Sequence, residues 1–473
     1  MSFRSPHNRF LTGTLSNVCC LCTKYAREET PKIETPQTRP WHNWSGSVQC
    51  QPQQVAQPAD IDALVQIIKT CSSDKRHVRV VGSGHSFSPL VETDDILISL
   101  EQIQGIEQID NQRNTATVFA GTTLKTLGKA LHAHGLAQEN LGGIHEQSLA
   151  GAISTGTHGT GIRFGTLSTQ VEGLTLVTAT GETLECSPEK NPAIFKAAQV
   201  SLGTLGIITK VKLRVVPAKR LHLVNRRERF SDCLLNLEHY TQENSHFEFF
   251  WFPHTPWVQT KFLNETEAPE GKSNLWENFN QIVVENGAYW LLSECCRLVP
   301  PLSKTISTIS AQSVPNANRV NYSHRLYVAP RLVCAQAMEY AIAAEYAQAV
   351  LREIEDCIKE HRFQVHFPLG CRFVQADDIW LSPAYQRDSV YIAVHMYRGM
   401  PYKAYFRHLE KILLRYNGRP HWGKIHTLDA TRLAGLYPRW HDFRRVRASL
   451  DPEGLFLNDY LQELLAVDAP VPC

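Results

Sequence analysis

A histidine that follows two closely spaced glycines is the first feature of this sequence that could do chemistry. The stretch VVGSGHSFSP covers residues 80–89 and offers Gly82, Ser83, Gly84, His85 and Ser86. Glycines allow backbone N–H groups to converge on an anion, and serine hydroxyls add further donors. A neutral imidazole nitrogen is a nucleophile. From these residues alone, three interpretations are open: an ordinary turn after a strand, a phosphate-binding turn, or a turn whose histidine does chemistry.

Two more glycine-rich segments lie downstream, LGGIHEQSLAGAISTGTHGTGIRFGTLS at 141–168 and SLGTLGIIT at 201–209. The first mixes glycine and alanine with serine, threonine and histidine, on neither a helical nor a strand period. The phosphate-binding pattern GxxxxGK[ST] is absent. The segment GTHGTG, which comes nearest to GxGxxG, lacks a preceding strand and a following acid. The sequence thus favours a bulky phosphorylated cofactor over a conventional nicotinamide dinucleotide fold.

Alternating strand and helix patterns must position these segments. Over 41–218 they predict an α+β domain, with a helix that begins after Asp60 and a hairpin in VEGLTLVTATGETLECS. Over 219–419 they predict a second α+β domain with an antiparallel sheet. In that domain the Ala-, Leu- and Glu-rich stretch 335–361 predicts one long helix.

Composition excludes several classes of protein. The chain has 473 residues, 43% hydrophobic and 20% charged, which describes a globular protein of two or three domains. A net charge of +2 gives no electrostatic footprint for nucleic acid, and no apolar run reaches the length of a spanning helix. Residues 1–40 are polar and proline-rich, which predicts a flexible tail. The CCLC run at 19–22 has no second ligand pair nearby, so no metal site is predicted.

Several motifs occur in the order found in a known family. RVVGSGHSFSP, NLGGIHEQSLAGAISTGTHGTG and SLGTLGIITKVKLRVVP together resemble the FAD-binding domain of the vanillyl-alcohol oxidase superfamily. RFVQADDIWLSP, RPHWGK and LDPEGLFLNDYL resemble the sugar-1,4-lactone oxidases, a branch that includes L-gulonolactone and D-arabinonolactone oxidases. The resemblance implies a two-part FAD-binding domain of the PCMH type over 41–218 and a substrate-binding cap over 219–419. It also implies a segment, 420–473, that returns to the FAD domain.

The resemblance implies FAD as the cofactor, joined covalently to the protein through His85. An electron-withdrawing substituent at the flavin 8α position helps the flavin to accept hydride. A histidine that only caps the turn is the alternative. Besides the residues of the first turn, the implied FAD contacts are Ser148, Gly151, Ser154, Gly156, His158, Gly159, Gly161, Leu205, Gly206 and Ile207. For His158, packing within the loop is the alternative.

Three residues are implied to act on the substrate. Arg372 offers a fork of donors to a ring oxygen or carbonyl, and Lys424 can bind a sugar oxygen or stabilise reduced-flavin charge. His421 can position the flavin or relay a proton. An ordinary, partly buried ion pair is the alternative for each of them.

Relatives carry a glutamate two residues before the arginine, where this chain has Gly370. Positions i and i+2 of a strand share a face, so an acid beside Arg372 is missing and the arginine loses its in-strand counter-charge. We therefore predict weak turnover of ordinary gulono- or galactonolactone and a gain on Gly370→Glu. Another acid from the cap, or a larger substrate, is the alternative.

The predicted function is oxidation of an alcohol carbon of a sugar lactone by hydride transfer to flavin N5, with O2 or another electron acceptor. Because this chain has Gly370 where the relatives carry a glutamate, an alditol or other sugar alcohol is an alternative substrate. A flavin-binding protein without turnover is a further alternative. Thirteen scattered cysteines favour reduced thiols and a cytoplasmic location. Relatives are often attached peripherally to membranes, so such an association stays open.

Overall fold

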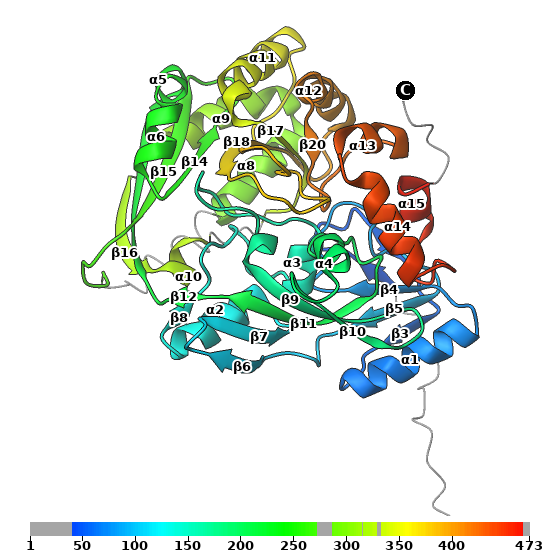
Figure 1. Ribbon diagram of the computed structural model, residues 1–473. Coiled ribbons are helices and arrows are strands. Elements are labelled where there is room, and N and C mark those ends of the chain that lie inside the picture. The colour runs from blue at the N-terminus through cyan, green and yellow to red at the C-terminus, as the bar shows by residue number, and fades with distance from the viewer. Residues whose placement is uncertain (1–39, 272–285, 315, 329–332, 467–473) are drawn as a thin grey trace, which may run out of the picture. The chain divides into compact units, whose positions relative to one another are not determined.

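The computed structural model describes residues 40–271, 286–314, 316–328 and 333–466. These described residues form one compact unit, whose two halves each centre on β-structure (Figure 1). Almost all of the predicted tail, and the CCLC run within it, lie outside the described residues. Within the described ranges no helix has both the length and the apolar composition that a membrane span requires.

Two sheets build the amino-terminal half. A parallel sheet has the order β3 (Gln54–Ala56), β5 (Ile96–Ser99) and β4 (Val78–Val81). An antiparallel sheet has the order β10 (Thr183–Cys186), β9 (Val171–Val177), β11 (Ile207–Arg214), β7 (Thr115–Phe119) and β6 (Ile106–Asp110). Two short pairs are β1 (Trp41–His42) with β2 (Gln49–Cys50), and β8 (Leu136–Ala137) with β12 (Val216–Pro217). The helices are α1 (Ile61–Ser73), α2 (Leu124–Ala133), α3 (Leu149–Ser154) and α4 (Pro192–Ala198), with a 3₁₀ turn at Leu167–Gln170.

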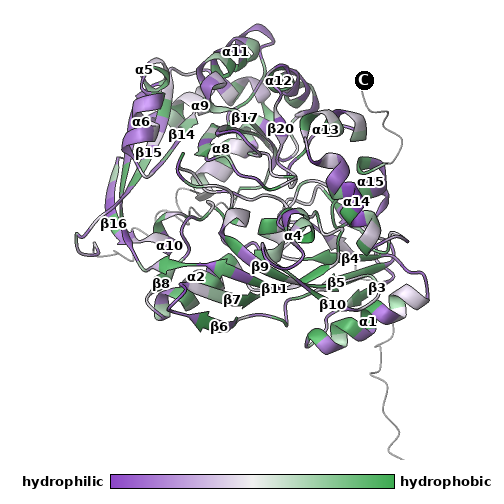
Figure 2. Ribbon diagram, in the orientation of Figure 1, coloured by the Kyte–Doolittle hydropathy of each residue, from purple (hydrophilic) through white to green (hydrophobic). Residues whose placement is uncertain are grey.

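Local sequence signals account for several of these elements. Asp60 caps α1 by accepting from the Ala63 N–H, as predicted, and this satisfies a donor that the first turn leaves free. The predicted hairpin forms between β9 and β10. In Figure 2 strand β4 is largely hydrophobic, and the apolar side chains of this half pack into the common core.

The second half, drawn green to orange in Figure 1, contains one antiparallel sheet of eight strands. Their order is β16 (Ala317–Tyr322), β13 (Arg220–Arg229), β15 (Trp257–Glu265), β14 (His246–Trp251), β18 (Leu369–Val374), β19 (Ser389–Tyr397), β17 (Ala335–Ala343) and β20 (Arg419–Pro420). Its helices are α5 (Phe230–Leu235), α6 (Leu237–Glu243), α8 (Asn286–Leu298), α9 (Ser303–Gln312), α10 (Ser323–Leu326), α11 (Ala347–Glu360) and α12 (Lys403–Arg415), with 3₁₀ turns at Pro300–Leu302 and Ala344–Tyr346. The predicted α+β fold with an antiparallel cap sheet is confirmed.

The prediction of one long helix over 335–361 is wrong in its first part. Residues Ala335–Ala343 form β17, a 3₁₀ turn follows, and only Ala347–Glu360 is helical. Strand β17 pairs with β19 along its whole length and with β20 at its middle. Alanine, methionine and glutamate favour a helix locally, but these backbone hydrogen bonds to distant strands outweigh that preference.

The last described residues carry α13 (Ala430–Leu436), α14 (Trp440–Leu450) and α15 (Asp459–Leu464), which lie beside the first strands of the chain in Figure 1. The contact is specific. The Val78 N–H donates to the Leu455 carbonyl over 2.8 Å, and the buried Arg79 side chain donates to the Phe456 carbonyl. The carboxyl-terminal segment thus packs on the amino-terminal half. The boundary proposed at residue 420 falls inside β20 and stays a prediction.

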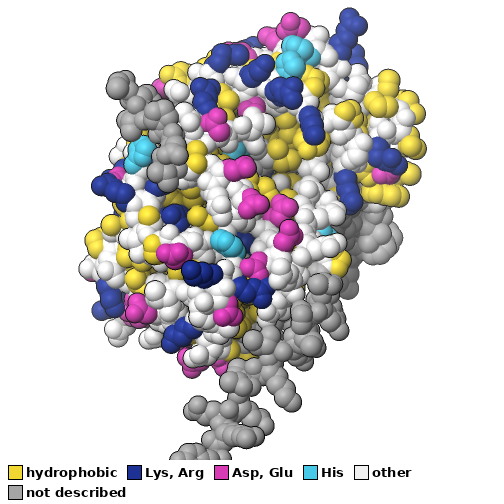
Figure 3. Space-filling view, turned by 90° about the vertical axis from the view of Figure 1, so that its right-hand side faces the viewer, with side chains coloured by type: hydrophobic (Ala, Val, Ile, Leu, Met, Phe, Trp, Pro, Cys, Tyr) yellow, Lys and Arg dark blue, Asp and Glu magenta, His cyan; other side chains and the backbone are white. Residues whose placement is uncertain are grey.

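Figure 3 shows the face that carries these carboxyl-terminal helices. Acidic and basic side chains are mixed with apolar ones over the described part of this face, without a continuous basic surface. This agrees with the small net charge of +2. The described side chains on this face do not form the basic stripe that is typical of nucleic-acid-binding surfaces.

Candidate active site

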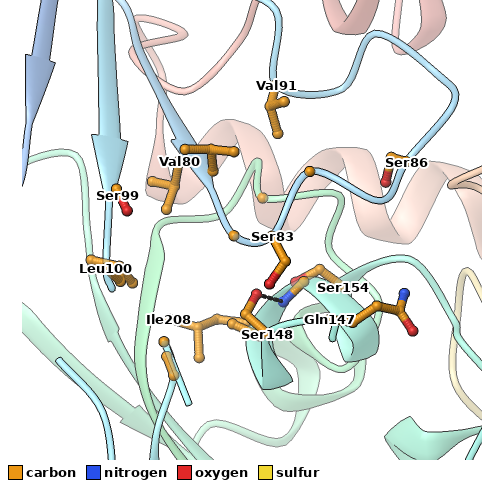
Figure 4. A pocket seen from close by; sticks show the side chains of 18 of the residues that line it. Val80, Ser83, Ser86, Val91, Ser99, Leu100, Gln147, Ser148, Ser154 and Ile208 are labelled. Carbon is orange, nitrogen blue, oxygen red and sulfur yellow. Dashed lines mark hydrogen bonds between the residues drawn. The ribbon is translucent and has the colours of Figure 1, made fainter. Parts of the chain in front are cut away.

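The first glycine-rich turn follows β4 directly and forms one wall of a cavity of about 310 Å³. A Cβ at Gly82 would lie 2.0 Å from the Ser148 hydroxyl oxygen, so only glycine lets the turn approach α3 so closely. Gly84 has a φ of +65°, which favours glycine for conformational reasons. In Figure 4, Ser83 on the turn and Ser148 at the start of α3 lie close together at one end of the cavity.

Most of the predicted FAD contacts line this cavity. They are Gly82, Ser83, Gly84, His85, Ser86, Ser148, Gly151, Ser154, Gly206 and Ile207. Apolar side chains also line the cavity, among them Val80 of β4, Leu100 just after β5 and Ile208 of β11 (Figure 4). Hydroxyl and backbone donors beside an apolar wall suit a cofactor that has a phosphate next to a flat ring system. The residues present therefore fit FAD.

Four predicted contacts line neither this cavity nor the smaller one described below, and the structure gives each a packing environment. Leu205 is fully buried in the core. A Cβ on Gly159 would lie 2.4 Å from the Asn140 side-chain oxygen, and Gly161 donates its N–H to the Phe373 carbonyl of β18. Gly156 has a φ of +69° and lies against Pro383. Gly156 and Gly161 permit close contact between the two halves of the chain, and Gly159 permits close packing within the first half.

His85 lies where two cavities meet, since it lines both. Burial lowers the pKa of His85; the negative charge of Glu146 opposes this shift, and the positive charge of Lys424 adds to it. The neutral imidazole is therefore the favoured form at neutral pH. A neutral ring has one nitrogen with a free lone pair, which is the form that a nucleophilic histidine needs.

The second cavity, of about 70 Å³, lies against the cap sheet. Four residues directly opposite one another on β14, β18, β19 and β17 share the face that lines it: Phe250, Gly370, Ala393 and Glu339. Arg372 and His395, each two residues from a member of this row, also line it. His158 of the other half and the carboxyl-terminal His421 and Lys424 also line it.

Arg372 has a counter-charge, contrary to the expectation that position 370 deprives it of one. Glu248 on β14 stands opposite Arg372, and the arginine Nε donates to its carboxylate over 2.7 Å. Lys261 contacts the other carboxylate oxygen at 2.9 Å. Burial opposes ionisation of Glu248, but Lys261 and Arg372 together hold its pKa well below the usual range. The arginine fork is thus held in a fixed orientation beside the cavity.

The sequence reasoning missed Glu339. It lies in β17, in the stretch predicted as helix, and is 4% exposed. His158 Nε2 lies 3.3 Å from its Oε1, yet the orientation leaves Oε1 without a hydrogen bond to any described residue. Burial opposes ionisation, but the interaction with His158 and the charge of Lys424 hold the pKa well below its usual range. A strand prediction for 335–343 would have placed an acid on the face of the cap sheet.

The HWGK motif connects the cap strand with the first glycine-rich turn. The backbone N–H of His421 donates to the backbone carbonyl of Glu339 over 2.9 Å. The backbone N–H of Phe87 donates to the backbone carbonyl of Gly423 over 2.8 Å. Lys424 Nζ lies 4.8 Å from the centre of the Phe87 ring. This segment therefore brings His421 and Lys424 to the junction of the two cavities.

His421 is a hydrogen-bond donor toward the cavity rather than a free base. Its Nδ1 accepts from the Gly423 N–H over 3.0 Å. Burial lowers the pKa of His421 to about 3; Glu339 opposes this shift, and Lys424 and His158 add to it. The ring is neutral at ordinary pH, and with Nδ1 occupied its proton resides on Nε2.

Three side chains in this region approach one another as metal ligands do. Atoms of His158, Glu339 and His421 that could bind a metal lie within 4.8 Å of one another. A metal-bound imidazole needs a free lone pair. In His421 the Nδ1 lone pair accepts from Gly423 and Nε2 holds the proton. The hydrogen bonding therefore disfavours a metal and agrees with a cluster that holds protons.

Comparison with known proteins agrees with this geometry. The chain matches the FAD binding domain model over residues 52–187 and the D-arabinono-1,4-lactone oxidase model over 211–464. It is 36% identical to an L-gulono-1,4-lactone dehydrogenase of Mycobacterium tuberculosis, over 90% of this chain and 99% of that one. It is 35% identical to an L-gulonolactone oxidase of Scyliorhinus torazame, over 89% and 97%. Cholesterol oxidase from B. sterolicum has the same fold, with a TM-score of 0.73 at 17% identity over 90% of this chain and 96% of that one.

The family models and these relatives show that the chain is an FAD-dependent oxidoreductase of the lactone oxidase or dehydrogenase class. Within that class, the chain belongs to the D-arabinono-1,4-lactone oxidase family. The family and the class of lactone oxidase or dehydrogenase that the motifs predict are thereby confirmed.

Proposed function

We propose that this chain oxidises a hydroxyl-bearing carbon of an aldono-1,4-lactone, such as L-gulono- or D-arabinono-1,4-lactone, with FAD attached through His85. The observation that carries the proposal is the junction of the two cavities at His85. The larger cavity suits the cofactor, and the smaller one holds the charged side chains that a polar substrate needs. FAD bound there supplies a two-electron acceptor for the hydride that leaves the carbon.

Arg372 and Lys424 are proposed to bind the lactone and to stabilise negative charge. Arg372 presents donors fixed by Glu248 to the ring oxygen or the carbonyl of the lactone. Lys424 lies against the turn that carries His85, where it stabilises charge that develops on the reduced cofactor. His421 adds an N–H donor that orients a hydroxyl.

The electron acceptor is part of the proposal. One relative carries the name of a dehydrogenase and another that of an oxidase at almost the same identity, so both classes of acceptor are tested. We propose O2 as the acceptor, with a quinone, a dye or a cytochrome as the alternative.

The experiment mixes the purified yellow protein with substrates under argon and follows flavin absorbance. L-gulono-, L-galactono- and D-arabinono-1,4-lactone are compared with sorbitol and xylitol. We expect the lactones to bleach the flavin faster than the alditols. Bleaching by the alditols alone would replace the lactone with an open-chain sugar alcohol. An unchanged spectrum with every compound would favour a flavin-binding protein without turnover. Admission of O2 to the reduced protein then measures oxygen reactivity.

A further inference from the structure

The cap sheet places Glu339 in the same cross-strand row as Gly370, the position at which the relatives carry a glutamate. Gly370 stands opposite Ala393, and Ala393 stands opposite Glu339. Residues that are directly opposite on antiparallel strands project to one face. Glu339 therefore faces the same cavity as position 370, two strand spacings or about 10 Å along the sheet. The side chain between them is only the methyl group of Ala393, which leaves the carboxylate access to the cavity.

The surroundings of Glu339 are those of a group prepared to exchange a proton. His158 Nδ1 contacts the Gly159 carbonyl at 2.9 Å, and because a carbonyl only accepts, this nitrogen holds a proton. His158 Nε2 then faces Glu339 Oε1 at 3.3 Å without a hydrogen bond between the two atoms.

One oxygen of the pair is available for a further hydrogen bond. Glu339 Oε1 is buried and has no hydrogen-bond partner among the described residues. A buried carboxylate oxygen left in this state is costly, because it has lost water without gaining a donor. A substrate hydroxyl in the smaller cavity, which Glu339 lines, would supply that donor.

We propose that Glu339 is a catalytic acid–base of this chain and takes over the task of the acid that Gly370 lacks. Glu339 accepts the proton of the lactone hydroxyl while the same carbon gives its hydrogen, with both electrons, to oxidised FAD. The C–O bond becomes C=O, one proton stays on the Glu339–His158 pair, and two electrons leave with the hydride. The positive charge of nearby Lys424 keeps the Glu339 carboxylate ionised and so able to accept a proton. This inference rests on the proposed lactone oxidation.

The test compares three variants with the wild-type holoenzyme. Glu339→Gln keeps the size of the side chain but cannot accept the proton, whereas Glu339→Asp keeps the carboxylate. Glu410→Gln is the matched control, because Glu410 is 3% exposed, bonds to Tyr340, and lines neither cavity. Stopped-flow absorbance under argon gives the limiting rate of flavin reduction and the apparent Kd for L-gulono-1,4-lactone. Metal content is measured on the same samples.

General acid–base catalysis contributes about 10²–10⁴-fold, so we expect Glu339→Gln to slow the limiting rate by at least about 100-fold. The apparent Kd should change by less than about fivefold, and Glu339→Asp should keep a rate within about tenfold of the wild type. Glu410→Gln should reduce at the wild-type rate. The flavin spectrum of each variant reports whether the cofactor site is intact.

Several results would overturn the assignment. A Glu339→Gln variant that reduces as fast as the wild type would end it. So would an equal loss in Glu339→Gln and Glu339→Asp with an altered flavin spectrum, since this would mean that the residue only supports the site. One zinc per chain, lost in Glu339→Gln, would make the cluster a metal site. If no lactone reduces the wild type, the proposed function itself fails, and this inference fails with it.

Discussion

Arg372 and Glu248 stand directly opposite each other on β18 and β14, and the arginine Nε donates to the carboxylate over 2.7 Å. They are 124 residues apart in the sequence, so no local sequence pattern predicts the pair. The geometry gives the two buried glutamates different roles. Glu248 orients the arginine, while the acid that faces the substrate cavity is Glu339.

The first prediction concerns the Arg372–Glu248–Lys261 cluster. Glu248→Gln leaves two buried cations without their counter-charge, and we expect a loss of about 3–5 kcal/mol in the free energy of unfolding at pH 7. The pKa of Glu248 is lower in the folded state than in the unfolded state. Its contribution is therefore complete above the unfolded value of about 4.3 and is lost as the pH falls below it.

Denaturant unfolding of the wild type and Glu248→Gln at pH values from 7 to 3.5 measures this effect. The difference between the two proteins should be constant down to about pH 4.5 and should shrink below it. Glu265→Gln is the control, because its pair with Lys219 is on the surface and such pairs contribute little. A difference that stays constant down to pH 3.5 would argue against an ionic origin.

The second prediction concerns the attachment of the cofactor. The neutral His85 at the junction of the cavities is expected to carry FAD covalently. After acid precipitation the yellow colour should stay with the protein pellet, and the denatured chain should fluoresce in a gel. His85→Ala should release the flavin to the supernatant. Flavin that washes out of the wild-type pellet would leave His85 as a residue that only supports the turn.

The third prediction concerns the contact between Gly82 and Ser148. A Cβ at position 82 would meet the Ser148 hydroxyl oxygen at 2.0 Å, so Gly82→Ala should displace the turn and lower the FAD content severalfold. Gly82→Ala with Ser148→Gly removes the obstructing atoms, and FAD content should partly return. Gly435→Ala is the control, since a Cβ there meets nothing within 4 Å. Unchanged FAD content in Gly82→Ala would show that the turn adapts freely.

The fourth prediction concerns Gly370. The sequence predicts a gain of turnover on Gly370→Glu, but a Cβ there would lie 3.2 Å from Cε1 of the Phe250 ring. Overpacking of this kind costs about 1–3 kcal/mol. We therefore expect Gly370→Glu alone to lower both stability and kcat/KM. The double variant with Phe250→Leu should recover stability and exceed the single variant in kcat/KM for L-gulono-1,4-lactone.

Gly370→Ala serves as the control for size, since it adds the Cβ without the acid. Thermal unfolding and steady-state kinetics on the four proteins separate the steric effect from the chemical one. A single Gly370→Glu variant that is as stable as the wild type and turns over faster would show that Phe250 yields readily and that the missing acid is the dominant factor.

Much of this protein was predictable from the sequence because the information is local. The glycines at 82 and 84, the serines beside them and His85 are contiguous, so the motif that resembles the FAD-binding turn of the family is visible in the sequence. The helix cap at Asp60 and the hairpin of β9 and β10 likewise depend on neighbouring residues. The family motifs predicted that Arg372, His421 and Lys424 act on the substrate, and all three line the second cavity.

Only the tertiary structure shows that Glu339 is the acid that lines the second cavity. Glu339 lies in a stretch whose residues favour a helix, and only pairing with β19 and β20 makes it a strand. Cross-strand register then places Glu339, Ala393, Gly370 and Phe250 in one row and sets Glu248 against Arg372. Register and pairing depend on contacts between residues far apart in the chain, which local patterns do not encode. The sequence thus determined the cofactor turn and the family, and the sheet determined the chemistry of the cavity.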